Sequence, residues 1–304
     1  MIQIRGLQKA YKAHPVLCGL NMTVERGEVY GFIGRNGSGK STTMNILAGL
    51  LARDGGEVTI DGRQVTTGQT VPVGYLPEEP ALLEYMNTWE YLEYIAAASG
   101  FTGDIQARST EVLGLVGLTD AADRKIGGYS RGMKQRAGMA AALYSDHEVI
   151  ILDEPTSALD PQGRAEVMQI IQTMRGLGKT VLLSTHILSD VERIADRVGI
   201  LNNGVLAEED TLQNLLTKYS EDSIQFELSK PDDTLKARLE ALDFVTRVEQ
   251  SVQHYLVWTT GRDETQNQAV FRFLADAGVA VSHYQLQKAT LEQVYLKVVG
   301  GNAV

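Results

Sequence analysis

The sequence predicts an α/β fold built around a largely parallel sheet, with a helical insertion and a small α+β domain after it. Before residue 219, short runs of β-branched and other apolar residues alternate with segments of helical periodicity. Helices that alternate with strands in this way typically cover the faces of a parallel sheet. The clearest strand candidates are Val29–Ile33, Val149–Leu152, Val181–Ser184 and Val198–Leu201.

Two further features modify this sheet. The segments Gln3–Leu7 and Gly56–Ile60 have the pattern of an additional antiparallel layer. Over about residues 88–142 the β-type runs stop, and apolar residues recur at helical spacing. We therefore expect the helical insertion in this region, within the first domain.

A change of pattern near Tyr219 marks a second domain. The alternation of Ile224, Phe226 and Leu228 with polar residues predicts a half-buried strand. The segments that follow predict a helix, two strands, a helix and a strand, and the order βαββαβ is that of a small ferredoxin-like domain. The expected domains are therefore residues 1–218, and an accessory or regulatory domain at residues 219–304.

Charge and composition limit the possible partners. The formal charge of the 304 residues is −10, so no nucleic-acid partner is expected, because phosphate binding requires clustered Lys and Arg. No apolar run reaches the roughly 18 residues of a membrane-spanning helix, and the N-terminus lacks a signal-peptide core. Membrane attachment is therefore expected only through a partner. The single cysteine, Cys18, indicates a reducing compartment and is expected in the core. The acidic residues 208–210 are expected in a solvated turn.

The segment Gly34–Ser41, GRNGSGKS, lies between a predicted strand and a predicted helix, which is the context of a nucleotide phosphate loop. Its glycines let successive N–H groups point at phosphate oxygens. Lys40 is placed to reach the β- and γ-phosphates, and Ser41 offers a hydroxyl to Mg²⁺. The alternative is a glycine-rich turn without a ligand. The expected nucleotide contacts are Gly34, Asn36, Gly37, Ser38, Gly39, Lys40, Ser41 and Thr42.

Two carboxylates follow the buried strand Val149–Leu152. Asp153 suits the binding of Mg²⁺, because enzymes with a phosphate loop use an acid at a strand end for this purpose. Glu154 suits a general base that orients the attacking water. A strand followed by two acids can also be a solvated strand end, and the phosphate loop upstream favours the catalytic interpretation.

Four segments together resemble the ATP-binding subunits of ABC transporters: GRNGSGKS, YSRGMKQR (Tyr129–Arg136), VIILDEPTSALD (Val149–Asp160) and STH (Ser184–His186). The resemblance covers about residues 2–218 and implies a P-loop ABC-type ATPase domain that uses ATP and Mg²⁺. It also implies a head-to-tail dimer of two copies. Each ATP then lies between the phosphate loop of one copy and the signature segment, Tyr129–Arg136, of the other.

The resemblance assigns further roles at matching positions. Ser130 and Gly132 would contact the γ-phosphate of an ATP held by the opposite copy, and His186 would contact the γ-phosphate and hold the water of Glu154. By local pattern alone, Ser130 predicts only the cap of an ordinary helix. The segment departs from the LSGGQ pattern of the family, since Arg131 stands in place of Gly and position 133 is Met rather than Gln.

Tyr11 stands where the family places an aromatic residue that stacks on adenine, and Val16 would complete that pocket. The alternative for Tyr11 is a surface tyrosine in a turn between strands. Glu78, within VGYLPEEP, stands where the family usually has Gln, and a carboxylate there suits a link to Mg²⁺. The two prolines of this segment, Pro77 and Pro80, would produce a turn in any case.

The expected function is ATP hydrolysis that drives a separate transmembrane permease subunit from the cytoplasmic face of the cell membrane. The C-terminal TLEQVYLKVVG resembles tails of ATPases from the bacterial drug, antibiotic and polysaccharide export branch, which favours export. The alternative is a soluble ABC-type ATPase that acts as a nucleotide-switched module on ribosomes or DNA. Its translation-type members usually carry two cassettes in one chain, whereas this chain has one. A third class, the P-loop kinases, would not explain the signature segment or the segment SALD (Ser157–Asp160).

Overall fold

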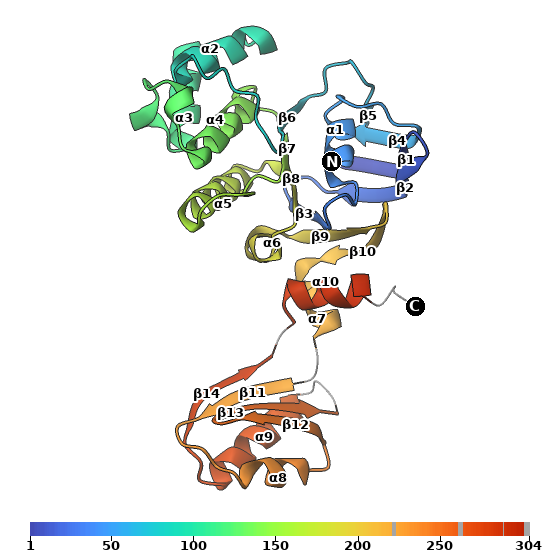
Figure 1. The fold of residues 1–304 in the computed structure, drawn as a ribbon, viewed down its shortest axis with the longest axis vertical. Coiled ribbons are helices and arrows are strands. Elements are labelled where there is room, and N and C mark those ends of the chain that lie inside the picture. Colours follow the sequence, from blue (N-terminus) through green and yellow to red (C-terminus); the bar gives the residue numbers. More distant parts are fainter. Residues whose placement is uncertain (221–222, 261–263, 288, 301–304) are drawn as a thin grey trace. The chain divides into compact units, whose positions relative to one another are not determined.

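The computed structural model describes residues 1–220, 223–260, 264–287 and 289–300 (Figure 1). The chain forms two compact units. The first comprises Met1–Leu212 together with the chain from Val298 onward, and the second comprises Gln213–Lys297. Within the described ranges, no helix combines the length and the apolar character needed to cross a bilayer.

The first unit contains two sheets. A four-stranded antiparallel sheet has the order β2-β1-β4-β5, and a six-stranded sheet has the order β10-β9-β3-β8-β7-β6 and is parallel except for β10. The strands are β1 (Ile2–Tyr11), β2 (His14–Val24), β3 (Val29–Gly34), β4 (Gly55–Ile60), β5 (Arg63–Gln64), β6 (Val73–Leu76), β7 (Val149–Asp153), β8 (Thr180–Thr185), β9 (Arg197–Asn202) and β10 (Val205–Thr211).

Helices cover both sides of the six-stranded sheet. Figure 1 shows α5 and α6 on one side, and α1 with the antiparallel sheet on the other. The helices of this unit are α1 (Lys40–Leu47), α2 (Thr88–Ser99), α3 (Ile105–Leu115), α4 (Arg131–Tyr144), α5 (Pro161–Gly176) and α6 (Leu188–Ile194). The predicted helical insertion consists of α2, α3 and α4, and the predicted antiparallel layer is the sheet that contains β1 and β4.

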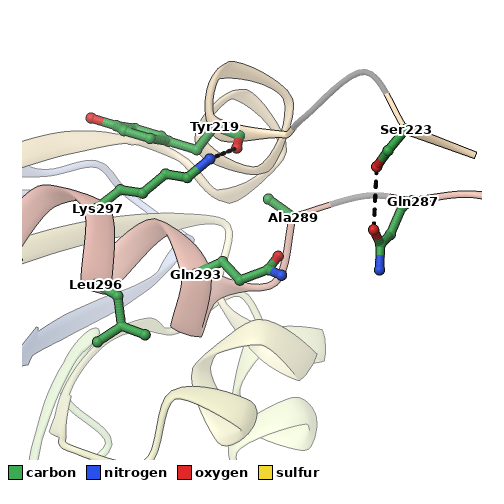
Figure 2. A pocket seen from close by; sticks show the side chains of 7 residues that line it. All are labelled: Tyr219, Ser223, Gln287, Ala289, Gln293, Leu296 and Lys297. Atoms are coloured by element: carbon green, nitrogen blue, oxygen red, sulfur yellow. Dashed lines mark hydrogen bonds between the residues drawn. The ribbon is translucent and has the colours of Figure 1, made fainter. Parts of the chain in front are cut away.

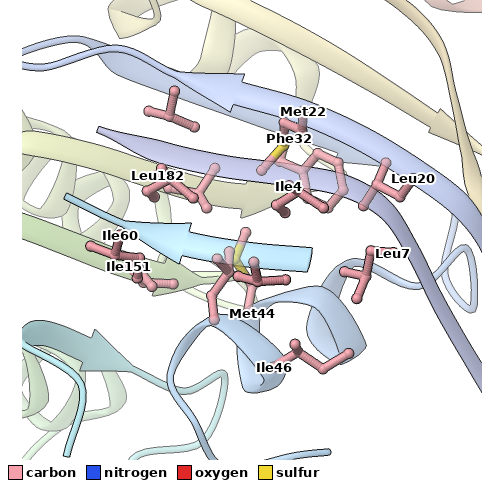
Figure 3. Close-up of a cluster of buried hydrophobic side chains, with 14 of the residues drawn as sticks. Ile4, Leu7, Leu20, Met22, Phe32, Met44, Ile46, Ile60, Ile151 and Leu182 are labelled. Atoms are coloured by element: carbon pink, nitrogen blue, oxygen red, sulfur yellow. The ribbon is translucent and has the colours of Figure 1, made fainter. Parts of the chain in front are cut away.

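The apolar core of the first unit lies between the two sheets and α1 (Figure 3). Its members labelled in Figure 3 are Ile4, Leu7, Leu20, Met22, Phe32, Met44, Ile46, Ile60, Ile151 and Leu182. Burying one such side chain contributes about 1.5–3 kcal/mol. The cluster includes residues of β3, β7 and β8, so it fixes three parallel strands whose carboxyl ends lie at one edge of the sheet.

Two glycines allow α4 to approach β6 and the loop that follows it. A Cβ on Gly74 of β6 would overlap the carbonyl oxygen of Ala142 in α4. A Cβ on Gly138 of α4 would come within 2.9 Å of Pro80. Because such distances are too short for real carbon contacts, only glycine permits this packing. The helical insertion is thereby fixed next to the loop that carries Glu78.

Two local predictions were wrong. The acidic run at residues 208–210 lies within β10 and not in a turn, because Glu209 accepts a hydrogen bond from the buried Tyr30 hydroxyl at 2.7 Å. A partner inside the fold thus gives one of these charges a place in a strand. Cys18 is exposed and not in the core, because the apolar neighbour Leu17 takes the inward position on β2.

The second unit contains an antiparallel sheet of order β12-β13-β11-β14, with the predicted βαββαβ succession. Phe226 of its central strand β11 is buried and stacks on Tyr255 with 5.0 Å between ring centroids. Leu235 and Val270, from the two helices α8 and α9, belong to the same apolar cluster. The elements that follow β10 along the chain are α7 (Leu212–Tyr219), β11 (Ser223–Leu228), α8 (Leu235–Glu240), β12 (Val245–Ser251), β13 (His254–Thr259), α9 (Glu264–Asp276), β14 (Val281–Leu286) and α10 (Leu291–Gly300).

Candidate active site

The phosphate loop connects the buried strand β3 to α1. Gly37 and Gly39 have φ of +80° and +111°, in the left-handed region that only glycine adopts without strain. A Cβ on Gly34 would lie 2.7 Å from the carbonyl oxygen of Leu201. The glycines are therefore required by the course of the backbone, which turns sharply and leaves residues 35–37 exposed at the sheet edge.

Lys40 is buried at the start of α1, with 5% of its surface exposed. Its Nζ donates hydrogen bonds to the carbonyl oxygens of Gly34, at 2.8 Å, and Arg35, at 3.3 Å. The hydroxyl of Ser38 is buried and has no hydrogen-bond partner among the described residues. A buried hydroxyl normally has a partner, so the loop holds an unused donor next to an oriented ammonium group, as an anion site requires.

Asp153 lies at the carboxyl end of β7 and is 2% exposed. It accepts hydrogen bonds from the hydroxyls of Ser184, at the end of β8, and Ser41, in α1. Burial raises the pKa of Asp153 above its ordinary value, and these two hydrogen bonds offset part of that rise. The structure therefore brings together Ser41 and Asp153, both predicted as ligands of Mg²⁺.

Glu154 contacts both of the other predicted catalytic residues, Lys40 and His186. Its Oε1 lies 3.4 Å from Nζ of Lys40, and its Oε2 lies 2.9 Å from Nδ1 of His186. The Glu154 side chain is 6% exposed, whereas that of His186 is 47% exposed. The carboxylate is thus paired on both oxygens, and His186 connects it to the surface.

The backbone at Glu154 is unusual, since its φ is +49°. A non-glycine residue in this region is strained and persists only when its surroundings hold it there. The N–H of Glu154 donates to both the carbonyl oxygen and the hydroxyl of Ser184, each at 3.1 Å. Ser184 therefore orients Asp153 and Glu154 together.

The signature residues lie at the start of α4. Ser130 caps the helix, and its Oγ accepts a hydrogen bond from the N–H of Met133 at 3.2 Å. Gly132 follows within the first turn. Figure 1 shows α4 among the helices of the insertion, away from α1 and its phosphate loop. The two helices that carry the signature residues and Lys40 therefore lie apart within one copy.

The other predicted contacts are less closely assembled. Val16 lies against the phosphate loop, because a Cβ on Gly39 would meet its carbonyl oxygen at 3.2 Å. Tyr11 lies at the end of β1, is 47% exposed, and has the ammonium group of Lys9 5.7 Å from its ring centroid. Glu78 is exposed in the loop after β6, and it has no hydrogen bond to another residue that the structure describes.

Sequence reasoning did not predict that Ser184 contacts both Asp153 and Glu154, or that Tyr75 lies near Asp153 and is hydrogen-bonded to Asn45. The Tyr75 hydroxyl donates to Oδ1 of Asn45 at 3.3 Å, and both burial and the charge of Asp153 raise the pKa of Tyr75. The motif STH includes Ser184 and could have indicated its role. Nothing local distinguishes Asn45 or Tyr75, because their positions depend on strand order.

The second unit has a pocket of about 230 Å³ that contains no predicted site residue (Figure 2). Ser223 donates to Oε1 of Gln287 at 3.2 Å at its wall, and Lys297 donates to the carbonyl oxygen of Tyr219. These polar groups satisfy one another.

The family model described as ABC transporter matches residues 17–157. The uncharacterized ABC transporter ATP-binding protein YxlF of Bacillus subtilis (strain 168) is 36% identical over 302 residues, which cover 98% of this chain and 99% of that protein. This chain belongs to the ATP-binding subunits of ABC transporters. It is accordingly an ATP-binding enzyme of the ABC-type ATPases.

A second relative of full length is the daunorubicin resistance ATP-binding protein DrrA3 of Streptomyces coeruleorubidus. It is 32% identical over 304 residues, which cover 98% of this chain and 96% of that protein. Among solved structures, a dimeric post-hydrolysis state of the ATP-binding cassette MJ0796, bound to ADP and Pi, matches with a TM-score of 0.63 at 26% identity. That match covers 70% of this chain and 99% of MJ0796, and it confirms the predicted α/β ATPase fold.

Proposed function

We propose that this chain is the ATP-hydrolysing motor subunit of an exporter and acts on a separate transmembrane permease subunit at the cytoplasmic face of the membrane. The contact of Glu154 with both Lys40 and His186 carries the hydrolytic part of the proposal. Full-length similarity to a protein named for daunorubicin resistance supports export, and it favours a transporter over a ribosome- or DNA-bound switch.

Nucleotide binding follows from the phosphate loop. The main-chain N–H groups from Gly34 to Thr42 surround the phosphates, and the N-terminus of α1 adds its positive field. Lys40 donates to the β- and γ-phosphates from its position at the base of the loop. Val16 and Tyr11 contact the adenine, where one stacked ring contributes about 1 kcal/mol.

The oxygen donors of Ser41 and Asp153 would hold Mg²⁺, and the carboxylate of Glu78 is the third group proposed for it. Among the described residues, no group of three or more His, Cys, Asp or Glu side chains could hold a metal ion without the substrate. This pattern suits Mg²⁺, which usually takes one or two carboxylates together with substrate phosphates. When bound, Mg²⁺ balances the charge of the phosphate oxygens.

Glu154 is the general base in this proposal. Its carboxylate accepts a proton from the water that attacks the γ-phosphate, and His186 holds this water and the phosphate in line. The hydrogen bonds that the N–H of Glu154 donates to Ser184 hold the backbone of Glu154 at the strand end. Lys40 stabilises the charge that develops on the phosphate, since an oriented ammonium in a buried site needs little reorganisation.

A second copy completes each site. The helix α4, which begins with the signature residues, lies away from α1 and the phosphate loop of its own chain (Figure 1), so Ser130 and Gly132 contact the ATP held by the partner copy. The dimeric state of the related cassette MJ0796 supports this arrangement. We further propose that residues 1–218 form the ATP-binding domain, with its helical insertion at about 88–142. Residues 219–304 then form an accessory domain for dimer contacts or regulation.

The proposal is tested by purifying the chain from detergent-solubilised membranes of its own source. Recovery with a multi-span membrane protein, together with Mg²⁺-dependent phosphate release from ATP, is the expected result. Recovery with ribosomes alone, or the absence of ATP hydrolysis in the presence of Mg²⁺, would contradict it.

A further inference from the structure

The segment that follows Glu154 is tied to α6 by a buried hydrogen bond. The Thr156 hydroxyl donates to Oδ2 of Asp190 at 2.7 Å, and Arg164 of α5 donates to Oδ1 of the same carboxylate at 2.6 Å. Thr156 is 2% exposed and Asp190 is 3% exposed. Asp190 therefore uses one oxygen for the segment after Glu154 and the other for α5.

The helix that carries Asp190 is itself firmly placed. It begins two residues after His186. The next residue after Asp190, Val191, is completely buried against β3, where a Cβ on Gly31 would overlap its side chain. Because β3 leads directly into the phosphate loop, α6 packs on the strand that positions Lys40. The same helix follows His186 in the chain, so it is tied to both catalytic side chains.

The segment held by this helix is under backbone strain. Both Glu154 and Ala158 have positive φ, at +49° and +52°. Thr156 lies midway between them, and its carbonyl oxygen also accepts from the N–H of Leu159 at 3.3 Å. A strained turn keeps its conformation only when neighbouring contacts fix it. The Thr156–Asp190 hydrogen bond is the side-chain contact placed to do this.

We propose that Asp190 is a positioning residue for ATP hydrolysis, which acts by holding the Thr156 hydroxyl and thereby the carboxylate of Glu154 opposite His186. This inference rests on the proposed role of Glu154 as general base. Asp190 itself lies in α6, beyond the motif segments, and touches none of the reacting atoms in this proposal. It fixes the distance between the segment after β7, which supplies Glu154, and the segment after β8, which supplies His186.

A contribution to fold stability alone is the competing explanation. A hydrogen bond to a charged group stabilises a fold more than one between neutral groups. A purely stabilising bond would therefore change the unfolding midpoint and leave turnover unchanged. A positioning bond changes kcat, because a displacement of about 1 Å at a catalytic group can cost up to a hundredfold.

The test uses Thr156→Val, which removes the hydroxyl and keeps the side-chain shape, and Thr156→Ser, which restores the hydroxyl. We expect kcat for ATP hydrolysis to fall roughly ten- to a hundredfold in Thr156→Val, with KM for ATP unchanged. Thr156→Ser should recover most of kcat. Unchanged kcat in Thr156→Val, or an equal loss in both variants, would overturn the proposal.

Asp190→Ala and the double variant with Thr156→Val test whether the two residues act together. We expect the single and double variants to have the same kcat within about twofold, because residues that act through one contact are not additive. Multiplying losses in the double variant would count against the proposal.

Arg175→Gln is the matched control. Arg175 also lies on α5 and pairs with an aspartate, Asp196, two residues after the end of α6, so this change removes an ion pair of the same helix α5 without reaching Thr156. Its kcat should remain normal. Glu154→Gln, assayed in parallel, separates the two hypotheses: normal turnover there rejects the proposed function, whereas loss there with normal turnover in Thr156→Val rejects only this inference.

Discussion

Glu154 receives both of its partners from segments that are distant in the sequence. Lys40 comes from the loop after β3, and His186 follows β8. In the six-stranded sheet β8 lies between β3 and β7, so the carboxyl ends of all three strands meet at one edge. A carboxylate that is buried and paired on both oxygens is held in one orientation, which is what a general base requires.

The change Glu154→Gln should leave ATP binding intact and lower the steady-state rate of phosphate release by about a hundredfold or more, the usual contribution of a general base. The amide keeps the shape of the side chain but cannot take a proton from water. Turnover is measured by phosphate release and affinity by titration with a fluorescent ATP analogue. Normal turnover would remove Glu154 from the mechanism.

The change Lys40→Ala should weaken ATP binding by roughly ten- to a hundredfold, since a charged hydrogen bond is worth about 1.5–3 kcal/mol. Isothermal titration with ATP gives the dissociation constant. Lys179→Ala is a suitable control, because Lys179 pairs with Asp146 and carries no predicted contact to the nucleotide. Equal affinities of the two variants would contradict the assignment of Lys40.

Among the secondary structure elements, α4 combines the signature residues with the close packing that requires glycine. It carries the signature residues at its first turn and packs along β6 through Gly74 and Gly138. The same contact reaches Pro80, in the loop with Glu78. A displacement of that loop should therefore displace α4, the helix that faces a second copy in the proposed dimer.

The change Gly74→Ala should destabilise the fold by about 1–3 kcal/mol, because the added methyl group overlaps the backbone of α4 and forces it away. Gly114→Ala provides the matched control. Gly114 lies within α3 with no other atom within 4 Å of a Cβ, so Ala there should stabilise by about 0.5–1 kcal/mol. Urea unfolding measures both. Equal effects of the two changes would show that the close packing of α4 on β6 is not required.

For the whole molecule, the decisive fact is that the signature helix and the phosphate loop of one chain lie apart. A complete site in the proposed mechanism then requires two copies, which together form two sites. The charge of −10 on each chain opposes their association, so the phosphates and their cationic partners must supply much of the attraction.

Complementation between defective copies tests this arrangement. Lys40→Ala and Ser130→Arg should each have very low ATPase activity as pure preparations. In a mixed dimer, one site combines both defects and the other combines an intact loop with an intact signature, so mixing should restore part of the activity. A mixture as inactive as its components would exclude a site shared between copies.

Stability should also depend on pH through His147. Burial, together with the charge of Lys179, lowers the pKa of His147 below its ordinary value of 6.5, against the opposing effect of Asp146. The unfolded chain therefore takes up the proton first as pH falls through 6.5. The contribution is present above pH 6.5 and is lost between 6.5 and the lower pKa of the folded state. Urea unfolding across this range should have a flatter pH dependence in His147→Asn, and an unchanged slope would contradict this.

The limits of sequence reasoning are clearest at two positions. Residues 208–210 were predicted in a turn because three adjacent charges usually lie in solvent, yet Tyr30 gives Glu209 a partner inside the sheet. Asp190 has an ordinary local pattern, and its contact with Thr156 spans 34 positions. Both cases depend on which strands and helices are neighbours, a property that periodicity along one segment does not contain.

The sequence by itself determined the ATPase family, the α/β sheet with its helical insertion and the succession of the second unit, because glycine geometry, strand alternation and helical spacing are local. Only the tertiary structure decided that Ser184 contacts both Asp153 and Glu154, that Lys40 pairs with Glu154, and that the signature helix lies away from its own phosphate loop. These contacts depend on strand order and on the close approach of packed elements, which become fixed only when the core excludes water from between the sheets.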